Sequence, residues 1–315
     1  MTPESICIQH TDFKFKNQQG KYQGKVRDVY DLGDTLIMIA TDRISAFDHV
    51  LPRPIPSKGQ VLNQTAQYFL QSVQDICPVW LQSVPDPNVG IGLKCEPIPI
   101  EMVVRGYMAG HAWRTYKTGV KTLCGVNLPD GLREGDAFDQ AIITPTTKAS
   151  EGHDQDISYS QLLDQNTIDQ ETLDKMYEFA IQLFKRGQEM ANRQGLILVD
   201  TKYEFGLHNG TLILMDEIHT PDSSRYYLAD GYEQRQNQGE SQIQLSKEFV
   251  REWLIHHQFQ GLENQIMPHF PDSFVWEISQ RYIHLYEKIT GSEFVNYANA
   301  NIMDRIKSNL QEYLI

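Results

Sequence analysis

The chain has 315 residues, of which 40% are hydrophobic, and its formal net charge is −13. This size and composition are typical of a soluble globular protein with one large domain or two closely packed lobes. No apolar run approaches the ~18 residues that a membrane-spanning helix needs, so we expect no membrane partner. An acidic chain without a basic stripe also argues against nucleic acid as a partner, whereas a local cluster of Lys and Arg can still bind a small anion.

The cysteines and the first residues of the chain indicate where the protein works. No two cysteines have the CxxC spacing, and none stands in a pattern typical of metal ligands, so we expect reduced thiols. The start, MTPESICIQH, has neither the basic segment nor the apolar core of a secretory signal. Both observations predict a cytoplasmic protein. The cysteines are Cys7, Cys77, Cys95 and Cys124.

The first third of the chain predicts a β-rich lobe. Residues 21–40 read as two strands around a turn at Gly33 and Asp34. A Pro-rich loop and a segment with apolar residues at helical spacing follow. Ile98 to Val104 then looks like a buried strand, and we place a boundary between two lobes just before it, at Glu96 to Ile98.

The rest of the chain mixes strands and helices. Residues 119–158 are rich in Gly, Asp, Thr and Pro and look like a long ordered loop, placed where a lid would sit. An amphipathic helix is expected from Asp169 to Gln194 and ends at Gly195. From Ser246 onward the sequence looks helical. This order of elements predicts an α+β or mixed α/β fold in two lobes.

Three charged residues alternate along a strand that begins as an apolar one, in the segment LILVDTKYEFG. Asp200, Lys202 and Glu204 are two residues apart, and side chains in a strand alternate between its faces, so the three lie on one face. This charged row indicates either a functional site or a solvated face with cross-strand ion pairs. The opposite face carries Val199, Thr201, Tyr203 and Phe205.

The turn after this strand decides where the next acid lies. Asn209 and Gly210 signal a hairpin. A two-residue loop would set Glu204 opposite Met215 and turn Asp216 to the far face. A three-residue loop with a bulge would bring Glu204 and Asp216 to the same face, and we favour this register because it gathers the charges. Two such carboxylates suit Mg²⁺, which prefers oxygen ligands and often accompanies nucleotide phosphates.

Two further segments combine glycine with basic residues. In GKVRDVY, Gly24 lets backbone amides approach a phosphate, and Lys25 and Arg27 add positive charge on one face. The segment lacks the Walker pattern, and a surface strand with solvated charges is the alternative. In EMVVRGYMAGHAWRTY, Arg105 ends a buried strand, a position that suits recognition of phosphate or carboxylate. His111 is a ligand contact, a helix-start residue or a packed histidine.

Eight segments follow one another in an order that resembles a known family. They are GKVRDVY, TDRISAFD, SKGQVLNQ, EMVVRGYMAG, TPTTKA, HDQDIS, LVDTKYEFG and DEIHTPDSSR, the last of which ends in Arg225, a second candidate anion clamp. They resemble the phosphoribosylaminoimidazole-succinocarboxamide synthase (SAICAR synthetase) family from about residue 20 to 245, with the helical tail of its longer members. The resemblance implies an ATP-dependent ligase of purine biosynthesis. Such an enzyme joins carboxyaminoimidazole ribonucleotide (CAIR) to L-aspartate and releases ADP and phosphate.

The resemblance also implies a fold distantly similar to that of protein kinases, in three units. Residues 1–97 would form a β-rich lobe that covers the nucleotide. Residues 98–245 would form a larger α/β lobe for the substrate and the metal. Residues 246–315 would form a helical tail packed on the second lobe. ATP, CAIR and L-aspartate are the expected partners, and the chain is compatible with a monomer or a homodimer.

The roles that the resemblance implies for single residues agree with the patterns above. Gly24, Lys25, Val26 and Arg27 would form the phosphate loop, and Glu96 and Ile98 the hinge that meets adenine. Glu204 and Asp216 would bind Mg²⁺, and Asp200 and Lys202 would be catalytic at the phosphoryl-transfer end. Arg105, His111 and Arg225 would bind the ribonucleotide, with Asp42, Ser45 and Lys148 in motifs near the site.

One residue departs from the family pattern, because many relatives have serine where this chain has His111; an imidazole could donate a comparable hydrogen bond. The implied chemistry makes an acyl phosphate from the CAIR carboxylate and ATP, which the aspartate amine then attacks. Asp200 or water would remove the proton, and the sequence leaves this open.

Two other functions are considered. A kinase-like phosphotransferase would use ATP without needing aspartate. A regulatory protein that has lost catalysis would lack an acid at 204 or 216 or the base at 202, and this chain has all three.

Overall fold

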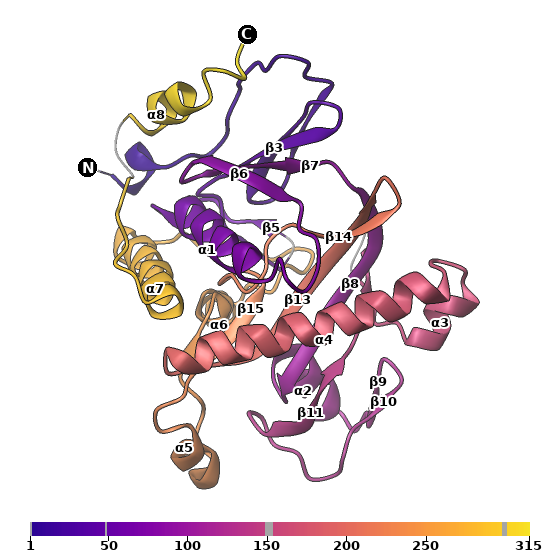
Figure 1. The fold of residues 1–315 in the computed structure, drawn as a ribbon. Helices are drawn as coiled ribbons and strands as arrows, with labels where there is room; N and C mark the ends of the chain where they lie inside the picture. Colours follow the sequence, from indigo (N-terminus) through magenta and orange to yellow (C-terminus); the bar gives the residue numbers. More distant parts are fainter. Residues whose placement is uncertain (1, 48, 149–153, 298–300) are drawn as a thin grey trace.

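Two large antiparallel sheets form the two lobes of the protein (Figure 1). The computed structural model describes residues 2–47, 49–148, 154–297 and 301–315. The first sheet lies at the top of Figure 1, and the second crosses the middle of the molecule below it. The predicted mixed α/β class is confirmed.

The first sheet has the strand order β1-β2-β3-β7-β6. Its buried face carries Tyr30, Ile37 and Ile39, which pack against Ile306 and Leu310 of the C-terminal segment. The predicted pair of strands in 21–40 is present, with a third strand added at its start. The strands are β1 (Gly20–Gln23), β2 (Arg27–Asp31), β3 (Thr35–Ala40), β6 (Leu81–Asp86) and β7 (Val89–Leu93).

The second sheet has two long central strands, β8 (Glu96–Tyr107) and β13 (Leu196–His208), which pair along most of their length. Around them the order is β11-β8-β13-β15-β16, with β12 beside β8 and β14 beside β13. The change from the first sheet to the second falls between β7 and β8, while the limits of the three units stay a prediction. The outer strands are β11 (Ala137–Ile143), β12 (Thr146–Thr147), β14 (Thr211–Met215), β15 (Ser224–Leu228) and β16 (Gln244–Leu245).

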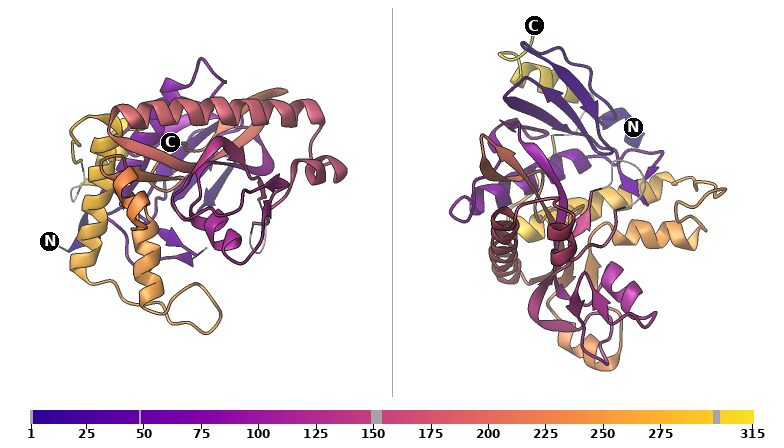
Figure 2. Two further views of the ribbon diagram at one scale, coloured as in Figure 1. Left: turned by 90° about the horizontal axis from the view of Figure 1, so that it is seen from below. Right: turned by 90° about the vertical axis from the view of Figure 1, so that its right-hand side faces the viewer.

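Helix α4 (Gln170–Arg193) covers the apolar face of this second sheet, and Figure 2 shows it from two further sides. The side chain of Asp169 accepts a hydrogen bond from Thr172 N at 2.9 Å and so caps the first turn. Gly195 follows the helix with φ of 70°, in the left-handed region that glycine adopts at little cost. The predicted helix and both of its ends are therefore confirmed.

The helical tail does not pack mainly on the second lobe, and that prediction is wrong. Helix α7 (Asp272–Thr290) packs on α1 (Lys58–Ser72), and α8 (Ile302–Asn309) packs on the first sheet. Helix α6 (Glu248–His256) contacts β16 of the second sheet, but its buried Val250 and Leu254 pack in the same cluster as α7. The apolar stripes of these helices were readable from the sequence, but a stripe does not state which surface it covers.

Residues 119–158 form short strands where we expected a loop. A hairpin of β9 (Thr122–Leu123) and β10 (Val126–Asn127) is followed by β11 and β12, which pair with β8. The part of the predicted lid at 149–153 lies outside the described residues, so the lid stays a prediction. The remaining elements are a 3₁₀ helix (Pro3–Ile6), β4 (Ser45–Ala46), β5 (His49–Val50), α2 (Gly110–Tyr116), α3 (Tyr159–Asp164) and α5 (Tyr232–Gln238).

Two further expectations concern the whole chain. The four cysteines are unpaired, as expected of reduced thiols. Within the described part of the chain, the structure offers no helix whose length and apolar character would let it cross a membrane.

The core between α1, α4 and β13 contains a neutral histidine. His219 has no exposed surface, and its Nε2 lies 2.6 Å from the hydroxyl oxygen of Tyr203, while Nδ1 has no hydrogen-bond partner. Its ring meets Phe69 edge-on at 4.7 Å, and Gly187 of α4 leaves it room, because a Cβ there would approach the ring within 2.5 Å. Burial lowers the pKa of His219 to about 3.

This histidine makes the stability depend on pH in a defined direction. The folded-state pKa is below the unfolded one, so its contribution is present above pH ~6.5 and is lost as the pH falls toward 3. Between pH 7 and pH 5 the free energy of unfolding should fall by about 2 kcal/mol from this group. Urea unfolding of the wild type and His219→Gln at both pH values measures the difference. Equal pH dependence in the two proteins would remove His219 as the cause.

Candidate active site

The central strand β13 carries a carboxylate that is held between two arginines. In the register of the sheet, Asp200 lies opposite Arg105 on β8 and opposite Arg225 on β15. Arg225 Nη1 donates to both oxygens of Asp200, at 3.0 and 2.8 Å, and Arg105 Nη1 donates to Oδ2 at 3.1 Å. Charge-assisted bonds of this kind hold both guanidinium groups in fixed orientations at one end of the charged row.

Lys202 stands two residues further along the same face. Its Nζ donates to Glu101 on β8 at 2.9 Å and also to Glu204, whose other oxygen accepts from Lys148. Burial would lower the pKa of Lys202, but Glu204, Glu101 and Asp216 raise it well above its usual value. Burial would raise the pKa of Glu204, but Lys202 and Lys148 lower it to about 2. Lys202 and Glu204 are therefore both charged near neutral pH.

The hairpin after β13 has the register that we did not favour. Glu204 pairs with Met215, which leaves Asn209 and Gly210 as a two-residue turn. Their φ angles are 50° and 77°, and a type I′ turn needs positive φ at both positions. The predicted three-residue loop with a bulge is therefore wrong.

Asp216 nevertheless reaches the charged cluster, because β14 ends at Met215. Asp216 has φ of 56°, so the alternation of a strand no longer decides where its side chain lies. Its Oδ1 accepts from Arg27 Nη1 at 2.7 Å, and Glu217 Oε2 accepts from Arg27 Nη2 at 2.5 Å. Arg27 belongs to the first sheet, so this guanidinium joins the two lobes at the acidic end of the row.

The loop between β1 and β2 is shaped by Arg43. Gly24 N donates to Arg27 O at 2.8 Å and closes the turn. Arg43 Nη2 donates to Gly24 O at 2.9 Å and to Arg27 O at 3.2 Å, and Nε donates to Lys25 O at 3.3 Å. The same guanidinium binds the buried carboxylate of Asp28 at 2.8 Å. Arg43 therefore fixes the backbone of the predicted phosphate loop.

A pocket of about 170 Å³ opens beside the charged row. His111 on α2 lines it from one side, and its Nε2 lies 2.7 Å from Asp156 Oδ2. The turn after β14 and the start of the tail form the other side, with Asp222, Lys247, Glu248 and Arg251. The predicted residues that line this pocket are Arg105, His111, Asp200, Lys202 and Arg225.

Two predicted substrate residues lie elsewhere. Asp42 has no exposed surface, and its oxygens accept from Ile8 N at 2.7 Å and from Gly59 N at 2.9 Å. Burial raises its pKa to about 6. In this structure the carboxylate ties the N-terminal segment to the start of α1, and a role for Asp42 in substrate binding stays a prediction. Ser45 lies in the β4–β5 hairpin, outside the pocket lining, and its role stays a prediction.

The other predicted positions lie where the two lobes meet. Lys148 contacts Glu204 in the charged row. Glu96 and Ile98 stand at the start of β8, directly after the first sheet ends. Val26 lies in the turn before β2, and its carbonyl accepts from both N and Oγ1 of Thr41, at 2.9 and 2.8 Å. Their roles in binding stay predictions.

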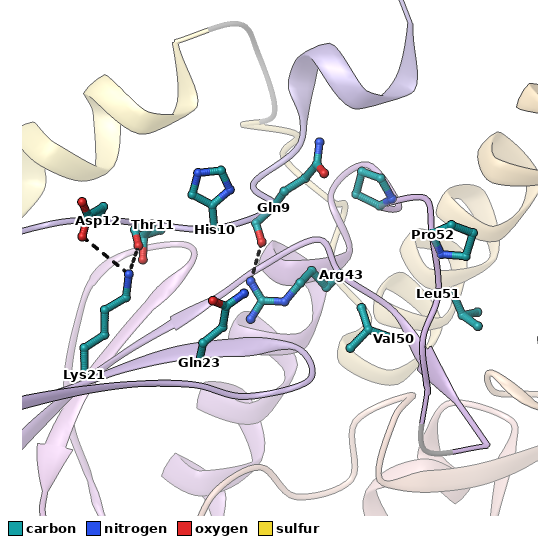
Figure 3. Close-up of a pocket in the computed structure, with 11 residues that line it drawn as sticks. Gln9, His10, Thr11, Asp12, Lys21, Gln23, Arg43, Val50, Leu51 and Pro52 are labelled. Atoms are coloured by element: carbon teal, nitrogen blue, oxygen red, sulfur yellow. Dashed lines mark hydrogen bonds and ion pairs between the residues drawn. The ribbon is translucent and has the colours of Figure 1, made fainter. Parts of the chain in front are cut away.

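A larger pocket, of about 600 Å³, lies in the first lobe between the N-terminal segment, β1 and residues 50–54 (Figure 3). Its polar groups bind one another: Arg43 donates to the carbonyl of Gln9, and Lys21 Nζ contacts the carbonyl of Thr11 and lies 3.7 Å from Asp12. None of the predicted catalytic or metal-binding residues lines it. We place the candidate active site at the smaller pocket, where charged side chains from several elements converge.

The acidic end of the row suits a magnesium ion that is carried by a nucleotide. Glu204 and Asp216 offer carboxylate oxygens there, and their charge is balanced by Lys202, Lys148 and Arg27. In the part of the chain that the structure describes, no three His, Cys, Asp or Glu side chains form a cluster able to hold a metal ion. Mg²⁺ usually takes one or two carboxylates and completes its coordination with phosphates and water, so two carboxylates are enough.

The sequence reasoning missed the pocket residues Asp222, Lys247, Glu248 and Arg251, and it missed three residues around the charged row. Glu101 is an acid inside the apolar strand PIPIEMVV, and such an interruption is itself a signal of function. Glu217 directly follows Asp216. Arg43 lies in TDRISAFD, but no local pattern states that its partners are backbone carbonyls.

The fold and this site define a two-lobed α/β enzyme whose cleft is built from paired acids and bases. The SAICAR synthetase family model matches residues 20–266. The chain is 56% identical over 310 residues to the phosphoribosylaminoimidazole-succinocarboxamide synthase of Bacteroides thetaiotaomicron, covering 98% of this chain and 99% of that protein. It is 55% identical to the synthase of the same name from Cytophaga hutchinsonii over 308 residues, with the same coverage of both chains.

Solved structures show the same relationship. SAICAR synthase from Saccharomyces cerevisiae, in complex with SAICAR, superposes with a TM-score of 0.76 at 30% identity, over 90% of this chain and 99% of that one. A SAICAR synthetase in complex with ADP shares the fold with a TM-score of 0.66 at 24% identity, over 88% of this chain and all of that one. The chain belongs to the SAICAR synthetase family.

The position of Arg43 leads to a stability prediction. Arg43→Gln leaves the buried Asp28 without its guanidinium partner, and breaking a buried ion pair costs about 3–5 kcal/mol. Lys94→Gln is the matched control, because it removes a more exposed ion pair with Asp31, which lies on β2 like Asp28. This variant should lower the free energy of unfolding by less than ~1 kcal/mol. Urea unfolding at neutral pH compares them. A similar small loss in both variants would show that Arg43 is dispensable for the loop.

Proposed function

We propose that this chain is the ATP-dependent ligase that condenses CAIR with L-aspartate to give SAICAR, ADP and phosphate in purine biosynthesis. The observation that carries the proposal is the charged row on β13, in a chain that resembles the family over almost its whole length. The yeast relative is in complex with SAICAR, which supports a ribonucleotide in the pocket of this chain. A cytoplasmic location and the choice between monomer and homodimer stay predictions.

ATP with Mg²⁺ is proposed at the acidic end of the row. The backbone that Arg43 holds at Gly24 to Arg27 would lie over the phosphates. Arg27 would exchange its carboxylate partners for phosphate oxygens. Glu204 and Asp216 would hold the magnesium ion, which supplies positive charge to the phosphates when bound.

CAIR is proposed at the other end, in the pocket lined by Arg105, Arg225 and His111. Asp200 holds both guanidinium groups in place, so we assign it first to positioning. A rigid pair of arginines suits an anionic substrate because little side-chain entropy is lost on binding. His111 lines the pocket, and its ring would contribute a hydrogen bond to the substrate there.

The reaction follows from these two ends. An oxygen of the CAIR carboxylate attacks the γ-phosphorus of ATP, so that ADP leaves and an acyl phosphate forms. The nitrogen of aspartate then attacks the acyl carbon, phosphate leaves with its bonding electrons, and the nitrogen loses a proton to Asp200 or water. Lys202 is held between Glu101 and Glu204 as a cation, which suits it to stabilise negative charge on the transferred group rather than to accept a proton.

The test is ADP release by the purified protein with Mg-ATP, CAIR and L-aspartate, repeated with each one omitted. ADP formation should need all three, and the product should carry the succinyl group, as mass spectrometry can detect. ADP formation without aspartate would favour the phosphotransferase alternative. ATP binding without any turnover would favour a regulatory protein.

The acidic end of the row can be tested separately. Glu204→Gln and Asp216→Asn should each lower kcat by at least about 100-fold, because each removes a charged ligand from the nucleotide end. Glu263→Gln is a control at an exposed position of the tail and should retain normal activity. Circular dichroism confirms that the variants are folded. Near-normal turnover in either variant would remove that residue from the proposed metal site.

A further inference from the structure

One wall of the pocket beside β13 is formed by residues of the helical tail, which the sequence analysis did not assign to the site. Helix α6 of the tail lies beside β15 (Figure 1), and its first turn brings Lys247, Glu248 and Arg251 into the pocket lining. Lys247 directly precedes the helix and Arg251 lies near its start, and both side chains line the pocket. The tail therefore contributes two cationic side chains to the pocket.

These two cations are only partly balanced by acids. Asp222 Oδ2 accepts from Lys58 Nζ at 2.9 Å, and Lys247 Nζ approaches the same oxygen at 3.5 Å. Asp222 Oδ1 accepts from the hydroxyl of Tyr282 at 2.6 Å. One carboxylate thus serves two ammonium groups, and Lys58, which has no exposed surface, is the nearer one. Lys247 is 12% exposed and lines the pocket.

Arg251 is in a similar position. Glu248 Oε2 accepts from Arg251 Nη1 at 2.9 Å and from Arg225 Nη2 at 3.2 Å, so two guanidinium groups share this carboxylate as well. The pocket as a whole is lined by five cationic side chains and three carboxylates, in a chain whose net charge is −13. The cationic excess is concentrated at the tail side, because Lys202 on the opposite side is bound by Glu101 and Glu204.

We propose that Lys247 and Arg251 bind an anionic group of a substrate, either the phosphate of CAIR or a carboxylate of L-aspartate, and so make the tail part of the substrate site. The inference rests on the proposed function, since it names further residues of the same pocket. Burial, Arg251 and Lys58 lower the pKa of Lys247, and an arriving anion would offset all three effects. Phosphate and carboxylate share the charge and the acceptor oxygens that these cations need.

The chosen substitutions leave the surrounding ion pairs intact. Lys247→Gln leaves Asp222 with Lys58 and Tyr282, and Arg251→Gln leaves Glu248 with Arg225. The structure therefore predicts folded variants. The controls are Lys288→Gln and Arg281→Gln, which remove exposed basic residues from α7 of the same tail. Urea unfolding midpoints verify that all four variants are folded.

Steady-state kinetics of the full chain tests the proposal. Each pocket variant should raise the KM of CAIR or of aspartate by about 10- to 100-fold, as expected for a lost charged contact, with the KM of ATP changed less than about twofold. Lys247→Arg should restore most of the loss. A raised KM for CAIR, together with weaker competitive inhibition by inorganic phosphate, identifies the phosphate as the bound group. A raised KM for aspartate alone identifies a carboxylate.

Two outcomes would overturn the inference. One is KM values in both pocket variants that match those of the controls. The other is a lower kcat with all KM values unchanged, which would indicate a structural role for the tail. Turnover of CAIR and aspartate by the wild type is measured first. Absence of turnover would disprove the proposed function. If the wild type is active, the variants then test the role of the tail alone.

Discussion

The carboxylate of Asp200 is the group on which the substrate side of the cleft depends. The register of the sheet places it between Arg105 and Arg225 on the two neighbouring strands. Without it, two buried guanidinium groups would face each other across β13 with no charge between them, which would cost several kcal/mol. The position of Asp200 is in turn fixed from the other face, where Tyr203 and Phe205 are fully buried in the core under α4. A slip by one residue would exchange the charged and apolar faces, so the core holds the site in register.

The two lobes are joined by buried ion pairs as well as by apolar packing. Arg27 of the first sheet reaches Asp216 and Glu217, and Lys58 of α1 reaches Asp222. Burying such a pair costs desolvation free energy, and removing one partner costs more because it leaves a buried charge without compensation. Both partners are therefore needed for a stable fold. This makes the relative position of the lobes depend on charges that also lie at the proposed nucleotide and substrate ends. Binding at either end would then involve an exchange of ionic partners.

The parts of the structure that follow from short-range periodicity were predictable from the sequence. The shared face of Asp200, Lys202 and Glu204 needs only the alternation of a strand, and the ends of α4 need only a capping acid and a glycine. The hairpin register was not predictable in this way. The pair Asn209 and Gly210 correctly indicated a two-residue turn. The sequence prediction instead favoured a three-residue loop, because that loop would place Asp216 on the same face as Glu204. In the structure Asp216 has a left-handed φ and lies beyond the end of β14. The alternation of side chains along a strand therefore does not predict where its carboxylate lies.

The placement of the tail shows a second limit. Its helices have apolar stripes, and those stripes pack largely on first-lobe residues, a choice that a stripe alone does not state. Only the folded chain shows that α6 brings Lys247 and Arg251 next to Arg225. A net charge of −13 gives no hint of a cationic pocket, because the excess arises from residues far apart in the sequence. The local sign of charge in a cleft is therefore a property of the tertiary structure, and an acidic composition does not exclude an anion site.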